Sequence, residues 1–173
     1  MARTDGLDLD DTAAVTWQLG RPPRGVVDVA HRCPCGDPDV VTTAPRLPDG
    51  TPFPTLYYLT CPAAAGAIGT LESGGLMREM ESRLAADAEL ASAYASAHQS
   101  YLDRRREVGL VPEIDGISAG GMPKRVKCLH VLAGHALAEG PGVNPFGDEV
   151  LAALSDWWTA GGCRAARAVP EDS

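Results

Sequence analysis

The sequence predicts an α+β fold, in which a small three-stranded antiparallel sheet packs against a helical layer of four to five helices. Residues 26–60 hold the segments richest in β-branched and aromatic side chains, separated by Gly, Pro and Asp. After residue 62, apolar residues recur three or four positions apart, which is the spacing of amphipathic helices. We therefore expect a single domain over residues 8–160, between a flexible N-terminus at 1–7 and a flexible C-terminal tail at 161–173.

Composition limits the classes of partner. The 173 residues include 15 Lys and Arg against 23 Asp and Glu, which gives a formal net charge of −8 at pH 7. Proteins that bind nucleic acid without sequence preference use a basic face, so no nucleic acid partner is expected. No apolar run approaches the ~20 residues of a membrane span, and the N-terminus has no basic-then-apolar signal segment. We expect a cytoplasmic protein with no membrane contact.

The first predicted elements are a helix and a hairpin. Residues 8–19 begin with several aspartates, which suit the positive end of a helix dipole, and Gly20 followed by two prolines ends the helix. Residues 26–32 alternate apolar and polar side chains as a strand does, and residues 39–43 are predicted to be the returning strand. The turn at residues 33–38 then holds a Cys-Pro-Cys motif at the tip of the hairpin.

A proline-rich loop and the third strand follow. Residues 44–54 contain four prolines and an Asp-Gly pair, which exclude regular structure and favour a rigid surface loop. We expect a protein partner to bind at this loop. Residues 55–60 have the strongest aromatic and β-branched content in the chain and are predicted to form a strand that ends at Cys61. Pro62 suits the first turn of the next helix.

Helices are predicted for most of the remaining chain. A Ser-Gly-Gly break at 73–75 separates the first two, and Asp87 is a suitable N-cap for the third. Three arginines at 104–106 precede Gly109 and are predicted to form a solvated helix end rather than an anion site. The predicted helices cover residues 62–72, 76–86, 87–109, 123–139 and 148–158.

Four cysteines form the main candidate site. Cys33, Cys35, Cys61 and Cys128 are predicted to bind zinc or an iron–sulfur cluster through their thiolates and to join the sheet to the helices. In a reducing compartment, clustered cysteines indicate metal binding or catalysis rather than disulfides. Only one residue separates Cys33 from Cys35, which departs from the usual zinc spacing of two or more. The choice between zinc and a cluster therefore stays open.

Two histidines, His31 and His135, are candidate replacements for one cysteine ligand. His130 is expected to point away from Cys128, because residues two apart on the predicted helix do not share a face. Cys163, near a Gly- and Ala-rich tail, is expected to stay outside the site. The alternative is that the cysteines are buried as small hydrophobic residues, since free cysteine is often buried.

A Gly-rich segment before the helix predicted at Pro123 is a candidate anion site. Backbone N–H groups at a helix start, together with nearby cations, attract phosphate or carboxylate. The segment is not a Walker motif, and a structural turn is equally compatible with the pattern. The predicted anion-binding residues are Ser118, Gly120, Gly121, Lys124 and Arg125.

Three stretches carry a family resemblance. They are HRCPCGDPDVVTTAPRLPDGTPFPTLYYLTCP at 31–62, GTLESGGLMREM at 69–80 and GISAGGMPKRVKCLHVLAGHALAEGPGVNPFGDEV at 116–150. Through them the chain resembles a bacterial family known as domain of unknown function 501. The resemblance covers nearly the whole chain and implies no catalytic residue, because no activity is assigned to the family. Its members are sometimes encoded near genes for a septum-formation initiator, enolase and an exopolyphosphatase-like protein.

Two functions are compatible with these observations. The first is a metal-stabilised binding domain without catalysis, in which the cysteines hold the metal and a partner binds the loop at 44–54. The alternative is an enzyme acting on a small phosphorylated or carboxylated substrate held at residues 118–125. If the metal is an iron–sulfur cluster, a redox role is a third option.

Overall fold

The computed structural model describes residues 6–159 and confirms the predicted α+β fold. A three-stranded antiparallel sheet, in the order β1-β2-β3, packs between helices. In chain order the elements of this part are α1 (Leu9–Leu19), β1 (Val26–Arg32), β2 (Pro38–Thr43), β3 (Tyr57–Leu59), α2 (Pro62–Ser73), α3 (Leu76–Ala86), α4 (Ala88–Val108), a short 3-10 helix (Pro112–Ile114), α5 (Leu129–Glu139) and α6 (Pro145–Ala153).

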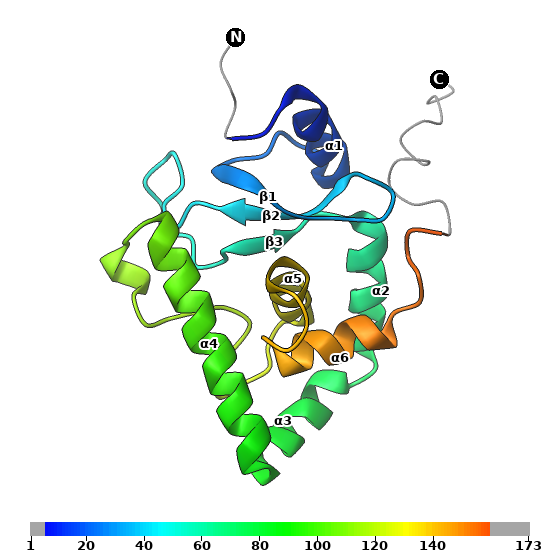
Figure 1. Cartoon of the computed structure of the whole chain (residues 1–173), viewed down its shortest axis with the longest axis vertical. Coiled ribbons are helices and arrows are strands. Elements are labelled where there is room, and N and C mark those ends of the chain that lie inside the picture. The colour runs from blue at the N-terminus through cyan, green and yellow to red at the C-terminus, as the bar shows by residue number, and fades with distance from the viewer. Residues whose placement is uncertain (1–5, 160–173) are drawn as a thin grey trace.

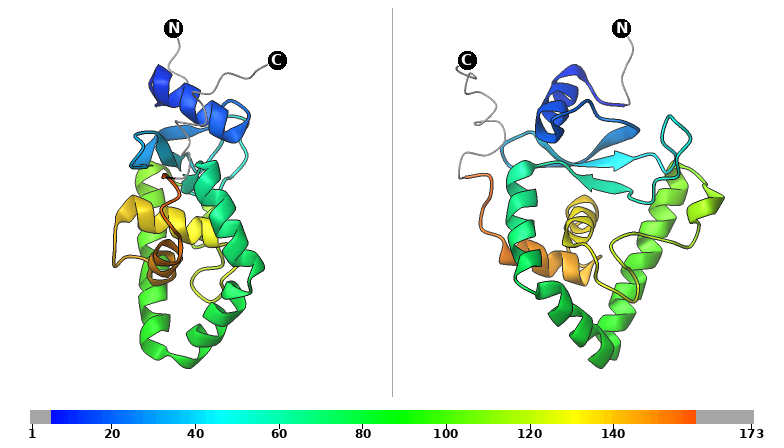
Figure 2. Two further views of the ribbon diagram at one scale, coloured as in Figure 1. Left: turned by 90° about the vertical axis from the view of Figure 1, so that its right-hand side faces the viewer. Right: turned by 180° about the vertical axis from the view of Figure 1, so that it is seen from behind.

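Figure 1 shows the layers. Helix α1 covers one face of the sheet, and α5 lies against the other face, where it contacts all three strands. Helices α2 and α4 stand on either side of α5, while α3 and α6 lie farther from the sheet, and the view from behind in Figure 2 shows the same arrangement. The chain after β3 therefore wraps around α5, which becomes the central helix.

Apolar cores lie on both faces of the sheet. Successive residues of a strand point to opposite faces, so in the central strand Val40 joins the larger core formed with the later helices, and Val41 joins a smaller core with α1. Both valines are buried. The buried members of the smaller core are Leu7, Val15, Val26 and Val41. Burial on both faces explains why β2 has adjacent valines rather than strict alternation.

The start of α5 differs from the prediction. The helix expected from Pro123 begins only at Leu129. The Tyr94 hydroxyl donates to the carbonyl of Arg125 at 2.8 Å, and Glu81 accepts from the next backbone N–H along the chain at 3.0 Å. These long-range contacts satisfy backbone groups that would otherwise need helical partners. The helix prediction over residues 123–128 is wrong for this reason.

The last helix is also shifted, because α6 spans Pro145–Ala153 rather than residues 148–158. The Asn144 side chain accepts from the N–H of Gly147 at 2.9 Å, and a proline fills the first turn, which is a common helix start. A Cβ on Gly147 would lie 2.2 Å from the carbonyl oxygen of Leu132, so α5 and α6 approach closely there.

Arg105 is buried, contrary to the prediction of a solvated helix end. The residue is only 4% exposed. Its guanidinium donates to the carbonyls of Pro54 and Ile114 at 2.8 and 2.7 Å, and also to the carbonyl of Ile117. Burial lowers the pKa of Arg105. The neighbouring arginines at 104 and 106 are exposed, as predicted. Arg105 thus fastens the end of the proline-rich loop to α4.

Tyr101 of α4 binds the backbone just before β3 in a similar way. Its hydroxyl accepts from the backbone N–H of Leu56 at 2.6 Å, and both residues are buried. Tyr101→Phe leaves that N–H without its acceptor and is expected to lower the free energy of unfolding by about 1–2 kcal/mol in urea titrations. Tyr58→Phe, at a half-buried tyrosine of β3, is the matched control and should change stability much less. Equal losses in the two variants would contradict the assignment.

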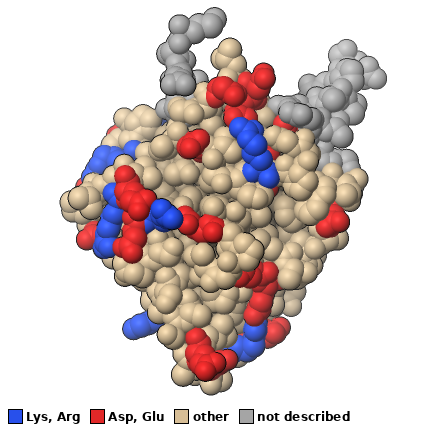
Figure 3. Space-filling view, viewed as in Figure 1, with Lys and Arg blue, Asp and Glu red and all other residues tan. Residues whose placement is uncertain are grey.

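Charged side chains of both signs are mixed on the face seen in Figure 3. Basic side chains pair with acidic ones in the structure, as in Arg83–Glu149 at 2.6 Å and Arg106–Asp115 at 2.9 Å. Over residues 6–159, no helix combines the length and the apolar composition needed to cross a membrane.

Candidate metal centre

Three side chains from two helices meet where α2 ends and α5 begins. Glu72 lies in the last turn of α2, Cys128 is the N-cap of α5, and His130 is in the first turn of α5. One ligand atom of each lies within 4.8 Å of the others, and all three residues are partly buried. Among residues 6–159, this is the group of three or more His, Cys, Asp or Glu residues whose ligand atoms lie this close together. We call it the candidate centre.

The backbone at Cys128 explains how the cysteine and the histidine face each other. Its φ of −151° and ψ of 109° are extended, and its Sγ lies 4.0 Å from Nδ1 of His130. The expectation that His130 points away is wrong, because it assumed helix at both positions. Since Cys128 provides no side-chain cap, the carboxylate of Glu72 accepts from the N–H of Leu129 at 2.8 Å instead.

Hydrogen bonding selects Nδ1 of His130 as the ligand atom. Its Nε2 lies 3.0 Å from the carbonyl oxygen of Ala65, which can only accept, so Nε2 carries the proton. Nδ1 faces Sγ of Cys128 and lies 3.1 Å from Oε1 of Glu72, and in a neutral ring it would carry the lone pair. Two acceptors at that separation repel unless a proton or a metal ion lies between them. A backbone carbonyl bonded to the remote nitrogen is the usual support of a metal-binding histidine.

The separations between ligand atoms fit a zinc ion. Zinc bonds of ~2.3 Å to sulfur and ~2.0 Å to nitrogen or oxygen, at tetrahedral angles, place sulfur and nitrogen about 3.6 Å apart and nitrogen and oxygen about 3.3 Å apart. The corresponding separations are 4.0 Å and 3.1 Å. Small side-chain adjustments therefore suffice. Three protein ligands leave the fourth tetrahedral position for water or for an external ligand.

A family model described as "Protein of unknown function (DUF501)" matches residues 29–152. The chain belongs to the DUF501 family. The matched segment runs from β1 into α6 and contains the whole candidate centre. Comparisons with curated proteins and with solved structures found no match.

Two of the cysteines predicted as ligands lie together in the turn between β1 and β2 of this DUF501 chain. The Sγ atoms of Cys33 and Cys35 are 2.9 Å apart, and the N–H of Cys35 donates to Sγ of Cys33 at 3.2 Å. Burial raises the pKa of the Cys33 thiol to about 12, and the hydrogen bond with Cys35 adds to the effect.

The four predicted cysteine ligands do not form a single group of ligand atoms among the described residues. Cys61 is buried at the N-cap of α2 and packs with Ala64 and Trp157. Within residues 6–159, neither Cys61 nor the Cys33–Cys35 pair belongs to a group of three ligand atoms within 4.8 Å of one another. The four-thiolate centre therefore stays a prediction without geometric support. Cys163, expected to be outside the site, lies beyond the described residues.

The two histidines named as replacement ligands have other contacts. Nδ1 of His31 donates to the buried carboxylate of Asp39 at 2.7 Å, and this hydrogen bond raises the pKa of His31. His135 is fully buried, with its Nδ1 3.2 Å from Nδ2 of Asn144 and its ring stacked on Tyr57. Neither histidine is part of the candidate centre.

The predicted anion segment has no helix start. The N–H groups of Arg125 and Lys127 donate to the carbonyls of Gly121 and Gly120, each at 2.8 Å. The guanidinium of Arg125 pairs with Glu81, also at 2.8 Å. Of the predicted anion-binding residues, Arg125 therefore has both its backbone N–H and its guanidinium bonded within the protein.

The other two members of that segment are arranged no better for an anion. Ser118 is buried, with its hydroxyl 2.7 Å from Nδ1 of His98. Lys124 is exposed in the turn. Anion binding at residues 118–125 stays a prediction, and so does the enzyme that would depend on it.

Glu72 is the residue of the candidate centre that sequence analysis missed. It is one of several acidic residues on predicted helices, and no local motif marks it. Cys128 and His130 carry a usable signal, since residues two apart share a face when the chain is extended. Recognising that signal requires knowing that the helix starts after Cys128.

Proposed function

We propose that this DUF501 protein is a metal-binding domain in which Glu72, Cys128 and His130 hold a zinc ion. The proposal depends chiefly on the orientation of His130. Its Nε2 lies beside a backbone carbonyl, so Nδ1 is the nitrogen that faces a thiol and a carboxylate and that can bind a metal ion when it carries no proton. A zinc ion at that point replaces the contact between two acceptors by three coordinate bonds and links α2 to α5.

The donor set favours zinc over an iron–sulfur cluster. One thiolate, one imidazole and one carboxylate are all common zinc ligands. Iron–sulfur clusters are held mainly by four cysteines, whereas the group of ligand atoms within 4.8 Å of one another in residues 6–159 contains one cysteine. Thiol ligands also suit a reducing compartment, which supports placing the protein in the cytoplasm.

The bound zinc would serve mainly to stabilise the helical layer. Metal binding by residues from separate elements is coupled to folding, because the unfolded chain has no preformed site. The side chains of Glu72 and His130 are 24% and 32% exposed, so the fourth coordination position can reach solvent. The coupling to folding leads us to propose a metal-stabilised binding domain first. Three protein ligands with an open fourth position are also the arrangement of catalytic zinc sites, so an enzyme is the second candidate.

Titration of the metal-free protein with Co²⁺ under oxygen-free conditions tests the proposal. We expect about one ion per chain and a sulfur-to-cobalt absorption band, which zinc abolishes by displacing cobalt. Cys128→Ser should lose the sulfur band, and His130→Ala should lose most of the affinity. Glu72→Gln keeps an oxygen that can accept from Leu129 and removes the negative charge, so it separates metal binding from helix capping.

Cys35→Ser is the matched control for the sulfur band, because it removes a half-buried thiol from the other cysteine-containing region. We expect this variant to bind Co²⁺ like the unmodified protein. If Cys35→Ser loses the band while Cys128→Ser keeps it, the metal binds at the turn and the proposed centre is wrong.

A further inference from the structure

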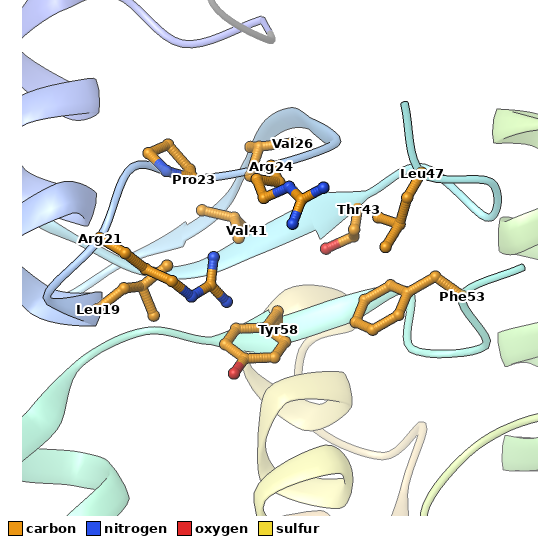
Figure 4. A pocket seen from close by; sticks show the side chains of 10 residues that line it. All are labelled: Leu19, Arg21, Pro23, Arg24, Val26, Val41, Thr43, Leu47, Phe53 and Tyr58. Carbon is orange, nitrogen blue, oxygen red and sulfur yellow. The ribbon is translucent and has the colours of Figure 1, made fainter. Parts of the chain in front are cut away.

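A pocket opens on the face of the sheet that carries α1. Its floor includes Val41 of β2 and Tyr58 of β3. One wall comes from the end of α1 and the segment after it, and the opposite wall comes from Leu47 and Phe53 of the proline-rich loop. Figure 4 shows these side chains around a common space. The pocket is separate from the candidate centre, with which it shares no residue.

Hydrogen bonds hold the loop wall in place. The N–H of Ala44 donates to the carbonyl of Gly25 at 2.7 Å, which fastens the start of the loop to the segment after α1. The N–H of Phe53 donates to the carbonyl of Pro45 at 2.8 Å, and the N–H of Leu47 donates to the carbonyl of Thr51 at 2.9 Å. The loop is therefore an ordered wall, as its proline content predicts, and the pocket is formed before any ligand arrives.

The pocket is the size of one small apolar group. Its volume is about 160 Å³, close to the ~150 Å³ of an engineered apolar cavity that binds benzene. The rings of Phe53 and Tyr58 lie at its edge with centroids 6.5 Å apart, so they can contact a bound ring.

Two arginines add positive charge to this apolar space. Arg21 and Arg24 both line the pocket, and Figure 4 shows the guanidinium of Arg21 between Val41 and Tyr58 and that of Arg24 near Thr43. Among the described residues, no carboxylate pairs with Arg21, whose guanidinium makes a long 3.4 Å hydrogen bond to the carbonyl of Pro22. Arg24 lies 3.5 Å from Asp49, and both of these side chains are largely exposed.

Asp49 pairs with Arg24 only through a long, solvent-exposed contact. Its Oδ1 accepts from the backbone N–H of Thr51 at 2.9 Å, and hydrogen bonds with Thr51 keep the pKa of Asp49 below its usual value. The carboxylate is thus ionised, with Oδ1 bonded in its own loop and Oδ2 in the long contact with Arg24. An incoming anion would compete with it for Arg24 and would meet Arg21 without competition.

We propose that this pocket binds a small amphipathic anion, a molecule with one aromatic ring or short alkyl group and a carboxylate or phosphate head. The ring enters between Leu47, Phe53 and Tyr58, where burial of apolar surface stabilises it. The anionic head lies at the mouth, where Arg21 and Arg24 donate hydrogen bonds to its oxygens. This assigns a small-molecule ligand to the region where sequence analysis expects a protein partner.

Phenyl phosphate is a suitable probe, with inorganic phosphate and phenol as its separate halves. Binding is followed in proton–nitrogen correlation spectra through the backbone amides of Thr43 and Tyr58 and the Nε–H groups of Arg21 and Arg24. We expect phenyl phosphate to shift these signals at concentrations about tenfold lower than either half needs. Benzoate in place of phenyl phosphate shows whether the head is preferentially a carboxylate or a phosphate.

Charge variants sharpen the test. The double variant Arg21→Gln/Arg24→Gln should weaken phenyl phosphate binding about tenfold and leave phenol binding unchanged. Asp49→Asn keeps an acceptor for Thr51, removes the competing charge and should strengthen binding. Arg78→Gln, at an exposed arginine on α3, is the matched control and should have no effect.

Several outcomes would overturn the proposal. Equal binding of inorganic phosphate and phenyl phosphate would show a simple cationic surface, and equal binding of phenol would show an uncharged pocket. Shifts confined to residues outside the pocket, or an Asp49→Asn variant that binds phenyl phosphate more weakly, would also contradict it. Because Glu72→Gln leaves this pocket intact, loss of zinc binding in that variant bears only on the metal centre.

Discussion

Zinc is expected to raise the free energy of unfolding of the metal-free protein by about 2.7 kcal/mol when free zinc reaches about a hundred times its dissociation constant. The gain arises because Glu72, Cys128 and His130 come together only in the folded chain, where their ligand atoms lie within 4.8 Å of one another. Urea unfolding at pH 7, with and without buffered zinc, measures this difference directly.

Variants show whether zinc stabilises the protein at the candidate centre or at the turn between β1 and β2. His130→Ala and Cys128→Ser should unfold at nearly the same urea concentration with or without zinc. Cys35→Ser should retain the full zinc effect, because its thiol lies in the turn between β1 and β2. A zinc effect that survives in Cys128→Ser and disappears in Cys35→Ser would place the ion at that turn and would contradict the proposed centre.

Acid is expected to destabilise the fold through His135. Burial lowers the pKa of this histidine from its usual value of 6.5 to about 4, partly opposed by Glu139. Since the unfolded chain binds the proton more readily, the stability contributed by neutral His135 is complete above pH 6.5 and is lost as the pH falls toward 4. The free energy of unfolding should fall by about 2 kcal/mol between pH 7 and pH 5 from this group alone.

The contacts of Asn144 strengthen that expectation. Its Oδ1 accepts from the N–H of Gly147 at 2.9 Å, so its Nδ2 is the group that faces Nδ1 of His135 at 3.2 Å. A proton on Nδ1 would bring two donors together, so the folded state favours the neutral ring. The ring also packs against Tyr57 and Tyr101, which limits its access to water.

His135→Gln tests this assignment in urea titrations at pH 7 and pH 5. Glutamine can still accept from Asn144 and does not titrate. The variant should be less stable than the unmodified protein at pH 7, because ring packing is lost, but its stability should fall about 2 kcal/mol less on going to pH 5. An unchanged difference between the two pH values would show that other groups cause the acid sensitivity.

The elements predicted most accurately are those whose ends are set by local hydrogen bonds. The Asp8 side chain accepts from the N–H of Asp11 at 2.8 Å at the start of α1, and Asp87 accepts from the N–H groups of Glu89 and Leu90 at the start of α4. Gly20 ends α1 with a φ of 70°. Such caps depend on residues a few positions apart, so they can be recognised in the sequence.

Boundaries set by distant residues were missed. Glu81 of α3 and Tyr94 of α4 bind backbone groups near Arg125, and this delays the start of α5. Arg105 is buried because carbonyls from the proline-rich loop and the 3-10 helix surround it. A contact between residues far apart in the chain leaves no periodic pattern that sequence analysis can detect.

The residues of the candidate centre were likewise predicted only in part. The sequence indicated a metal site and named Cys128 as a ligand, because cysteines and histidines in such a chain favour that chemistry. It also grouped Cys33 with Cys35, which the structure places in contact. It missed Glu72 and set His130 aside, because both choices depend on where α5 begins and on what α2 brings beside it.

The α+β class, the order of the helices and strands, the capped helix ends and the family can all be recognised in the sequence, because each depends on local composition, spacing or motif. Which side chains share a site depends on how the elements pack. The carbonyl of Ala65 and the carboxylate of Glu72 orient His130 from a different helix, and the loop at 44–54 forms a pocket with residues that follow α1. Packing brings these groups together, and packing depends on the whole chain.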